Sequence, residues 1–374
     1  MSAELLSRAL FAKLGRSMLR PYKDGCQRLE TAARFFSCLL VCLLVSAAAT
    51  TAAPPAESSK SLRVYFVDVE GGQATLFVTP EGNSLLIDTG WPGNNGRDAD
   101  RIVAAAHDAG IQKIDYVLIT HYHDDHVGGA PQLAAKIPIG TFIDHGENRE
   151  PGAQKLYDAY KALLDSGKYK HIVAKPGDKL PIKGIDVEVI AADGAVLQKP
   201  LPGAGQANPA CKATGYAGDQ TENPRSLGTL ITFGKLKILD LGDLTADKER
   251  ELMCPNNRLG KIDVYIASHH GFLQSGSMAL VHAIAPRVSI VDNGATKGGS
   301  PLALQLMKTS PKPKDIWQLH YSQEATVNNS APEFIANLQG PDAGNHLKLL
   351  AQQDGSFSVF NSRTKETRNY SSTR

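Results

Sequence analysis

The chain has 374 residues, of which 42% are hydrophobic and 21% charged, and its formal net charge is +2. This composition is ordinary for a soluble globular protein with one large domain or two small ones. The excess of basic residues lies in the first 53 residues, because residues 54–374 contain 33 basic and 35 acidic residues. A near-neutral mature chain gives no support for a surface that coats nucleic acid.

Residues 1–53 have the organisation of a secretory signal peptide. Seven Lys or Arg residues precede an apolar run at Phe35–Val45, which is too short to span a bilayer comfortably, and small residues follow it. We expect cleavage near Ala49 or Ala53, export to the periplasm or the extracellular space, and no transmembrane segment in the mature chain. An uncleaved anchor or a start codon further along the chain is the alternative.

The first half of the mature chain predicts three strands and then alternating helices and strands. After a polar linker at residues 54–60, alternating and apolar runs separated by turn residues predict antiparallel strands at Leu62–Val69, Ala74–Val78 and Ser84–Ile87. Helical spacing predicts helices at Asp98–Ala109, Pro131–Ile137 and Ala153–Ser166. Further strands are expected at Ile114–Ile119 and in Thr141–Gly146.

The second half repeats this alternation. Strands are expected at Val187–Ala191, Leu227–Phe233, Leu236–Leu241, Ile262–Ala267, Val288–Asp292 and Ile316–Leu319. Helices are expected at Ser277–Ala285, Pro301–Lys308 and Ala331–Leu338, before a hairpin at Leu347–Phe360. We therefore expect an α/β protein in which residues 61–360 form two sheets packed face to face between helices, and a disordered polar tail at residues 361–374.

A long Gly/Pro-rich stretch at Lys199–Pro224 shows neither helical nor strand periodicity, which is typical of a functional lid or a disordered loop. Cys211 lies in this stretch, and Cys254 is the other cysteine that remains after cleavage of the leader. In an oxidising compartment the two either form a disulfide or stay unpaired, and the sequence leaves both alternatives open.

The densest chemistry lies at Thr120–Gly129, directly after the predicted strand at Ile114–Ile119. Its pattern His-x-His-x-Asp-His places His121 and His123 on one side of a loop and Asp125 with His126 on the other. Burying so many ionisable groups costs several kcal/mol unless something compensates, and a divalent cation is the usual compensation. The pattern therefore predicts a site for two adjacent metal ions.

Thr120–Gly129 resembles the signature of the metallo-β-lactamase superfamily, and the predicted sandwich resembles that family's four-layer αββα fold. The resemblance implies that Asp88 orients the metal loop from behind and that Asp243 bridges both metals. It also implies that His269 or His270 binds the second metal, and the sequence does not choose between them. Asp240 is expected to be structural.

Three further stretches are similar to the hydrolase domain of ComEC-type DNA-uptake proteins and their secreted relatives. They are Phe66–Ala74, Asn223–Ser226 and His269–Gly271. Where those relatives tend to read Asp-Val-Gly-Gln-Gly-Asp, this chain has Asp-Val-Glu-Gly-Gly-Gln. The similarity implies activity on phosphodiesters and makes Ser226 a candidate substrate contact.

Other candidates follow strand ends. His145 ends a strand soon after the metal loop and is either a ligand of the first metal, a substrate contact or a surface residue. The glycine-rich segment at Asp292–Ser300 carries Asn293 and Lys297, a combination suited to an anion such as phosphate or carboxylate, although a plain strand-to-helix turn is the alternative. His320 also ends a strand, where it reaches the substrate or packs structurally.

The expected function is that of an exported dinuclear metal hydrolase acting on phosphodiesters. Zinc is favoured by a His-rich, Asp-bridged ligand set, with manganese or iron as alternatives, and the metals would lower the pKa of a shared water. Asp125 is expected to orient the resulting hydroxide and Asp88 to assist it indirectly.

Two observations narrow the chemistry within the family resemblance. Asp243 argues against a dedicated β-lactamase, and His123 favours hydrolysis over the chemistry of di-iron relatives that use a carboxylate there. The alternatives are a lactonase or another carboxylic-ester or amide hydrolase, and a non-catalytic metal-stabilised binding protein. The substrate is expected to be a small molecule or an oligomer, with nucleic acid only as substrate, and the oligomeric state is left open.

Overall fold

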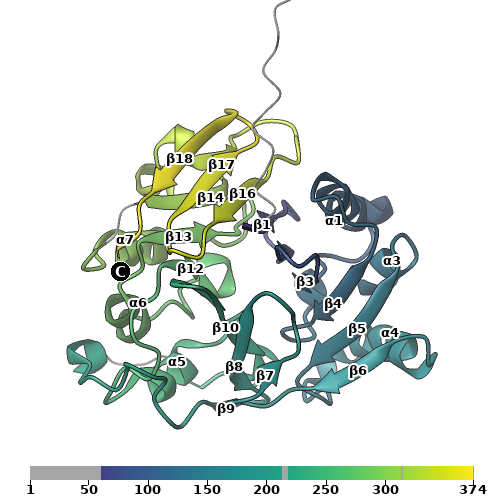
Figure 1. Ribbon diagram of the computed structural model, residues 1–374, viewed down its shortest axis with the longest axis horizontal. Coiled ribbons are helices and arrows are strands. Elements are labelled where there is room, and N and C mark those ends of the chain that lie inside the picture. The colour runs from purple at the N-terminus through teal and green to yellow at the C-terminus, as the bar shows by residue number, and fades with distance from the viewer. Residues whose placement is uncertain (1–59, 213–217, 313–314, 374) are drawn as a thin grey trace, which may run out of the picture. The chain divides into compact units, whose positions relative to one another are not determined.

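The computed structural model describes residues 60–212, 218–312 and 315–373, so the predicted signal peptide lies outside the described residues. Two nine-stranded sheets are their main feature (Figure 1). In spatial order, the first sheet contains β18 (Glu366–Tyr370), β17 (Phe357–Asn361), β16 (Leu347–Ala351), β1 (Leu62–Phe66), β2 (Thr75–Val78), β3 (Ser84–Ile87), β4 (Ile114–Leu118), β5 (Ile139–Asp144) and β6 (Lys170–Val173).

The second sheet is built from the middle of the chain. In spatial order it contains β15 (Ile335–Asn337), β14 (Asp315–His320), β13 (Val288–Val291), β12 (Val264–Ile266), β11 (Leu236–Asp240), β10 (Gly228–Phe233), β8 (Asp186–Ala192) and β7 (Lys179–Leu180), with β9 (Ala195–Val196) paired to β8. β10 and β11 form a hairpin, because they pair antiparallel with Phe233 opposite Leu236. The hairpin predicted at Leu347–Phe360 is also present, since β16 pairs antiparallel with β17 in the first sheet.

Helices cover the outer face of each sheet. The first sheet is covered by α1 (Arg97–Asp108), α3 (Ala130–Ala134) and α4 (Gln154–Asp165), and α2 (Asp124–Val127) follows β4. The second sheet is covered by α5 (Ala246–Met253), α6 (Met278–Ile284) and α7 (Pro301–Lys308). Between the sheets lies an apolar core that includes Phe77, Ile87, Ile231 and Ile238. The predicted four-layer αββα sandwich is therefore confirmed.

Adjacent residues of β3 show how one strand serves two apolar layers. Leu85 and Ile87 face the core between the sheets, whereas Leu86 faces the core beneath the helices. Because both faces of such a strand are buried, its sequence is a continuous apolar run, as sequences of parallel strands usually are. Burial on both faces therefore explains why the sequence shows apolar runs and little alternation here.

Two predictions near the carboxyl terminus are wrong. Ala331–Leu338 does not form a helix, because Pro332–Phe334 forms a 3-10 turn and β15 then pairs with β14. The tail is not disordered, because β18 pairs antiparallel with β17 and extends the first sheet to Tyr370. The Tyr370 hydroxyl donates to Asp315 at 2.6 Å and accepts from the Trp317 indole at 2.9 Å, so tertiary partners order a segment that looks polar in sequence.

The parallel parts of both sheets place their carboxyl ends where chemistry-bearing loops follow. In the first sheet β3, β4, β5 and β6 are mutually parallel, and in the second β11 to β15 are. Asp88 follows β3, the histidine-rich loop follows β4, Asp243 follows β11, and His269 follows β12. Ligand sites of α/β proteins lie at such strand ends, because the loops there are free to vary while the sheet holds their bases rigid.

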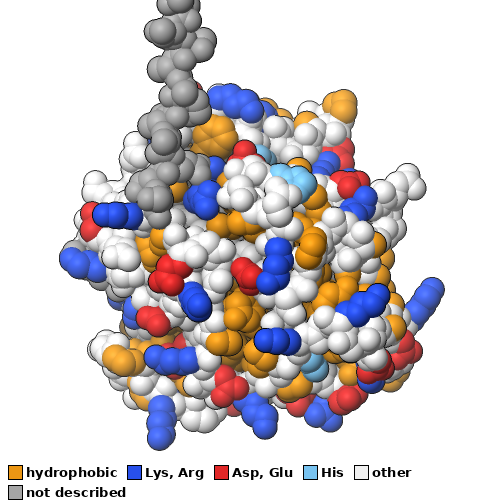
Figure 2. All heavy atoms as spheres, turned by 45° about the vertical axis from the view of Figure 1, so that its right-hand side comes forward, with side chains coloured by type: hydrophobic (Ala, Val, Ile, Leu, Met, Phe, Trp, Pro, Cys, Tyr) orange, Lys and Arg blue, Asp and Glu red, His pale blue; other side chains and the backbone are white. Residues whose placement is uncertain are grey.

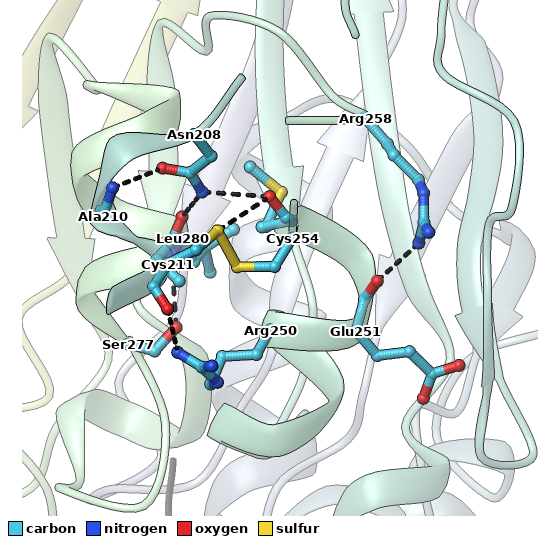
Figure 3. Close-up of a disulfide and its surroundings, with 11 residues drawn as sticks. Asn208, Ala210, Cys211, Arg250, Glu251, Cys254, Arg258, Ser277 and Leu280 are labelled. Atoms are coloured by element: carbon cyan, nitrogen blue, oxygen red, sulfur yellow. Dashed lines mark hydrogen bonds between the residues drawn. A yellow bond between two sulfur atoms is a disulfide. The ribbon is translucent and has the colours of Figure 1, made fainter. Parts of the chain in front are cut away.

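Cys211 and Cys254 form a disulfide that ties the long loop to the end of α5 (Figure 3). Asn208 reinforces this attachment, because its side-chain amide donates to the carbonyl groups of Met253 at 3.0 Å and Ala279 at 2.8 Å. The sequence had left this pairing open, and the structure resolves it as a disulfide.

Reduction of the disulfide should make the Lys199–Pro224 stretch more sensitive to protease. The bond spans a sequence separation of 43, and a cross-link of this kind typically contributes about 2–4 kcal/mol. Limited proteolysis with and without reductant, with cleavage sites read by mass spectrometry, measures the effect. The Cys254→Ser variant should match the reduced protein without reductant, and equal digestion rates in all samples would count against the tether.

Charged groups of both signs share the face in Figure 2, where Lys and Arg side chains alternate with Asp and Glu and with apolar patches. This face carries no broad area of one sign. Among the described residues, no helix combines the length and hydropathy needed to cross a bilayer.

Candidate metal centre

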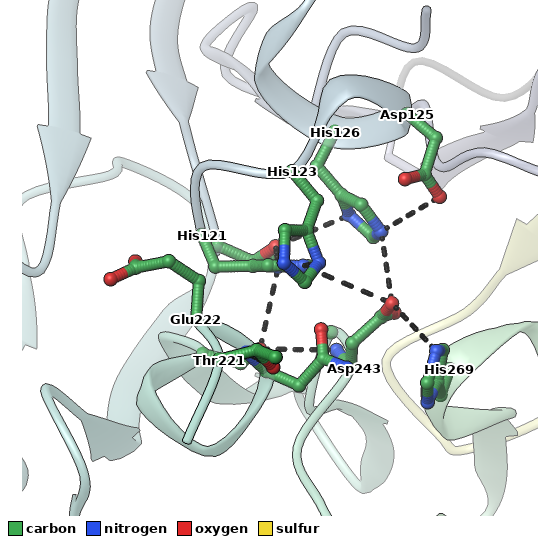
Figure 4. Close-up of polar contacts among 12 residues, drawn as sticks. His121, His123, Asp125, His126, Thr221, Glu222, Asp243 and His269 are labelled. Carbon is green, nitrogen blue, oxygen red and sulfur yellow. Dashed lines mark hydrogen bonds and ion pairs between the residues drawn. The ribbon is translucent and has the colours of Figure 1, made fainter. Parts of the chain in front are cut away.

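Two groups of metal-ligating side chains meet at Asp243 (Figure 4). The first group contains His121, His123 and Asp243, with His121 Nε2 lying 3.0 Å from His123 Nδ1 and 3.8 Å from Asp243 Oδ2. In each group the candidate ligand atoms all lie within 4.8 Å of one another. Shared membership places Asp243 where a carboxylate can contact two ions at once.

The second group contains Asp125, His126, His270 and Asp243, and all four are buried. His126 Nε2 lies 3.1 Å from His270 Nε2, 3.2 Å from Asp125 Oδ2 and 3.3 Å from Asp243 Oδ2. His270 is the member of the predicted His269/His270 pair that belongs to this group. His269 Nε2 lies 3.4 Å from Asp243 Oδ2 and approaches the same carboxylate from another side.

Asp88 fixes the loop that follows β4 and one of its histidines. Its Oδ1 accepts from the Thr120 backbone at 2.8 Å, and its Oδ2 lies 2.7 Å from both the Thr120 hydroxyl and His126 Nδ1. A carboxylate on one imidazole nitrogen leaves the other nitrogen to face a metal, which is how protein metal sites orient their histidines. The predicted indirect role of Asp88 is consistent with these contacts.

Strained backbone positions bring the second-sheet residues to the centre. Gly242 has φ +53°, and a Cβ atom there would lie 2.8 Å from the Thr120 side chain, so glycine is required beside Asp243. His269 and His270 also have positive φ values, 54° and 53°. For residues other than glycine this conformation costs of order 1–3 kcal/mol each, and such strain clusters at functional sites.

The arrangement of donors fits a divalent cation. Imidazole nitrogens of neighbouring histidines face each other at 3.0–3.1 Å, and the buried Asp243 Oδ1 accepts no hydrogen bond. Burial alone would raise the pKa of Asp243, but the neighbouring charges of His126, His269 and His270 hold it well below its usual range. Buried ionised carboxylates among histidine nitrogens are the ligand set that zinc and similar metals prefer.

Ser226 and Lys297 contact the ligands directly. The Ser226 hydroxyl accepts from the Asp243 backbone at 3.2 Å and lies 3.4 Å from His121 Nδ1. The Lys297 ammonium group donates to Asp125 Oδ2 and, at 2.8 Å, to the Gly71 carbonyl. Two of the four residues predicted as substrate contacts, Ser226 and Lys297, therefore lie at the centre, where they also contact candidate ligands.

Three other predicted residues lie outside the two groups. His145 Nε2 faces Glu222 at 2.9 Å, so the structure does not bring His145 among the candidate ligands. The Asn293 side-chain amide donates to the backbone carbonyl groups of Gly294 and His320 and supports that loop. His320 Nε2 lies 2.7 Å from Asp68 Oδ1, within a third group that contains Asp68, Glu70 and His320.

The turn between β1 and β2 packs against the backbone of the histidine-rich loop at Asp125. The Gln73 backbone donates to the Asp125 carbonyl at 3.1 Å, and a Cβ atom on Gly72 would lie 2.4 Å from that same oxygen. The Lys297 contact with Gly71 ties the turn to the second sheet. Sequence reasoning did not give this turn a role, because a Gly-Gly pair reads as an ordinary turn until its neighbour is known.

Sequence reasoning also missed Glu150 and Glu222. Glu150 Oε2 lies 2.9 Å from His123 Nε2, and the Glu222 backbone donates to the same Glu150 oxygen at 2.8 Å. Both lie in loops without periodicity. Only their positions along the chain gave a signal in the sequence. Glu150 follows a parallel strand, and Glu222 directly precedes the Asn223–Ser226 stretch.

Asp240 is buried near the centre and takes a structural position. Its Oδ2 accepts from the Gln73 amide at 2.6 Å and its Oδ1 from the Gly242 backbone at 3.0 Å. Burial raises the pKa of Asp240 to about 7. Between about pH 4 and pH 7 the unfolded chain has therefore lost a proton that the native protein keeps, so this group lowers native stability as pH rises through that window.

Replacing Asp240 with Asn should remove this pH dependence. The stability of the Asp240→Asn variant relative to wild type should improve from pH 5 to pH 7, by at most about 1.4 kcal/mol per pH unit. Urea unfolding of both proteins at the two pH values, with chelator present throughout, measures the difference. A stability difference that is the same at both pH values would show that Asp240 titrates normally.

A four-layer sandwich places a histidine and aspartate centre, suited to binding metal ions, at the carboxyl ends of its strands. A family model described as Metallo-beta-lactamase superfamily matches residues 67–207, which span the histidine-rich loop. This match covers 141 of the 374 residues, so this part of the chain is similar to the metallo-β-lactamase superfamily.

Curated relatives include proteins of the ComEC type, as the sequence motifs predict. Recombination protein 2 of Haemophilus influenzae is 25% identical over 239 residues, which are 63% of this chain and 25% of that protein. ComE operon protein 3 of Bacillus subtilis is 27% identical over 188 residues, or 50% of this chain and 20% of the other.

A hydroxyacylglutathione hydrolase of Stenotrophomonas maltophilia is 31% identical over 102 residues, which are 27% of this chain and 37% of that protein. These matches therefore span between a fifth and two fifths of the relatives' own lengths. Among solved structures, the metallo-beta-lactamase fold protein YhfI from Bacillus subtilis aligns with 68% of this chain and 96% of its own, at 14% identity and a TM-score of 0.42.

Proposed function

We propose that the protein binds two divalent metal ions and hydrolyses phosphodiesters. The observation that carries the proposal is the sharing of Asp243 by two groups of ligands, His121 with His123 and Asp125 with His126 and His270. Zinc is the favoured metal because three or more ligands are imidazoles or carboxylates in each group. When bound, such ions supply a nucleophile at neutral pH by lowering the pKa of water, and they polarise the scissile group.

The chain's own residues prepare the centre for an anionic substrate. Burial would raise the pKa of Asp125, but His126, His270 and Lys297 hold it well below its usual range, so the carboxylate stays ionised. The Lys297 ammonium group lies 5.2 Å from the ring centre of Trp91 and 6.0 Å from that of Phe272. A cation held beside the ligands between two aromatic rings favours a substrate with negative charge and an apolar group.

Hydrolysis of a carboxylic ester or thioester is the second candidate. It is supported by the similarity of 102 residues to a hydroxyacylglutathione hydrolase, a name that specifies a thioester substrate for that relative. Lys297 serves this candidate too, because a carboxylate and a phosphate are both anions.

Activity assays on the metal-reconstituted protein separate these candidates. The substrates are bis-p-nitrophenyl phosphate, a hydroxyacylglutathione, a homoserine lactone and nitrocefin, each tested with wild type and with the Asp243→Asn variant as the inactive control. Turnover of the phosphodiester with the highest kcat/KM is the expected result. Turnover of the thioester or lactone alone would reject the phosphodiester proposal in favour of the second candidate.

Export of the mature protein is part of the same proposal. It is supported by the basic and apolar organisation of residues 1–53 and by the Cys211–Cys254 disulfide, since disulfides persist in oxidising compartments. Amino-terminal sequencing of the secreted protein should give a start near Thr50 or Pro54, and an intact Met1 would contradict cleavage.

A further inference from the structure

A chain of hydrogen bonds leads from one candidate ligand to the end of the long loop. His123 points its Nδ1 at the first group and its Nε2 at Glu150, whose Oε2 lies 2.9 Å away. The same Glu150 oxygen accepts from the Glu222 backbone at 2.8 Å. One carboxylate oxygen therefore joins a histidine after β4 to the segment that precedes Ser226.

Glu150 is held in place from its own loop. Its backbone donates to the Asn148 side chain at 3.0 Å, and its carbonyl accepts from the Asn148 amide at 2.8 Å. The Glu150 and His123 side chains are each 23% exposed, so solvent weakens this pair only in part. A fixed acceptor on Nε2 selects the tautomer in which Nδ1 carries the lone pair toward a metal.

Glu222 anchors the other end of the chain. It is fully buried, and its carboxylate points away from the ligand groups (Figure 4), toward His145 Nε2 at 2.9 Å and the Arg149 backbone at 2.8 Å. The His145 ring packs on Tyr122, with ring centres 4.7 Å apart. A buried carboxylate is stable only when it is paired and hydrogen-bonded, so these partners fix Glu222 firmly.

The segment fixed by Glu222 also contacts the other two members of the first group. Ser226 follows Glu222 by four residues, and its hydroxyl lies 3.4 Å from His121 Nδ1 and accepts from the Asp243 backbone at 3.2 Å. His121, His123 and Asp243 are thus all approached from one short stretch of chain, either directly or through Glu150. Asp88 differs from Glu150, because it contacts His126 of the second group at 2.7 Å and also reaches His121 of the first group through the Thr120 hydroxyl, which lies 3.0 Å from His121 Nδ1.

We propose that Glu150 and Glu222 are positioning residues specific to the first metal site, with Glu150 fixing the His123 imidazole and the buried Glu222–His145 pair fixing Glu150. The inference rests on the proposed dinuclear centre and assigns the first site orienting carboxylates in addition to Asp88, which contacts the ligand loop of both sites. His145, expected from sequence to be a ligand, a substrate contact or a surface residue, lies three contacts away from His123, through Glu222 and Glu150.

Cobalt binding tests this assignment without measuring turnover. The wild-type protein should bind two Co²⁺ ions per chain. Titration calorimetry and the visible absorption of each bound ion measure this binding. The Glu150→Ala substitution should lower the affinity for one ion by about 10- to 100-fold, as loss of an orienting partner typically does. The affinity for the other ion should stay at its wild-type value. Glu150→Gln keeps an acceptor oxygen, so it should restore most of this loss.

Glu222→Gln should weaken binding of the same ion as Glu150→Ala, whereas Asp88→Asn should weaken binding of both ions, because Asp88 contacts His126 directly and His121 through Thr120. Glu147→Gln is the matched control on the same loop, because Glu147 is exposed and bonds Tyr157 at 2.9 Å. Unchanged affinity for both ions in Glu150→Ala would overturn the assignment, and so would equal weakening of both ions. A wild type that binds fewer than two ions would instead contradict the dinuclear centre itself.

Discussion

Replacing Asp243 with Asn should abolish hydrolysis and lower metal content. The carboxylate is common to both ligand groups, and the amide that replaces it carries no charge and only one acceptor oxygen. Metal ions contribute several kcal/mol to transition-state stabilisation in enzymes of this kind, so kcat/KM should fall by about 10³-fold or more. Steady-state kinetics and metal analysis of the same preparation measure both effects.

Asp247→Asn is a suitable control for this substitution. Asp247 lies four residues further on, in the first turn of α5, and belongs to neither ligand group. Its carboxylate accepts a hydrogen bond of 2.5 Å from the Thr245 hydroxyl. The control should keep two metal ions and near wild-type activity. Full activity in Asp243→Asn, with a control that behaves as expected, would refute a shared bridging ligand.

Removal of the metals should lower the melting temperature substantially. The native protein gathers charged and lone-pair-bearing ligands that an unfolded chain does not hold together, so metal binding favours the folded state. A metal present at a thousand times its dissociation constant stabilises the native protein by about 4 kcal/mol per site. For a domain of this size, the loss of both sites together corresponds to a Tm that is lower by about 10 °C or more in the presence of chelator.

Calorimetry with chelator, followed by stoichiometric zinc, checks this effect and its reversibility. Zinc should restore the original Tm of wild type, while Asp243→Asn should respond little to either addition. A Tm that is identical with and without chelator would show that the folded protein binds no metal tightly.

Local patterns in the sequence predicted most of the sandwich. Strands such as β3 and β4 are apolar runs flanked by turn residues, and α7 is bounded by Ser300, whose side chain caps it by accepting from Ala303. The errors lie where distant partners decide the conformation. Tyr370 orders β18 through Asp315 and Trp317, and β15 exists because β14 offers a parallel edge, neither of which is visible in a short window.

The residues of the candidate centre also divide into those that the sequence predicts and those that only the folded structure reveals. His121, His123, Asp125 and His126 were predictable because they share one short motif, and Asp243 and the His269/His270 pair because they belong to stretches that resemble family motifs. Only the structure selects His270 as the member of the second group. Glu150 and Glu222 were not predictable, because a lone glutamate in an irregular loop carries no periodicity or spacing. Their importance follows only from the 2.8–2.9 Å contacts that folding creates.

The division of the ligands between the two sheets has a consequence for folding. Neither half of the chain can assemble a complete centre alone, because Asp125 and His126 follow a strand of the first sheet while Asp243 and His270 follow strands of the second. On the proposed assignment, high-affinity metal binding requires that the two sheets have first docked across their apolar core. Ions bound there would cross-link the two sheets, so metal affinity would measure whether the two halves of the chain have joined.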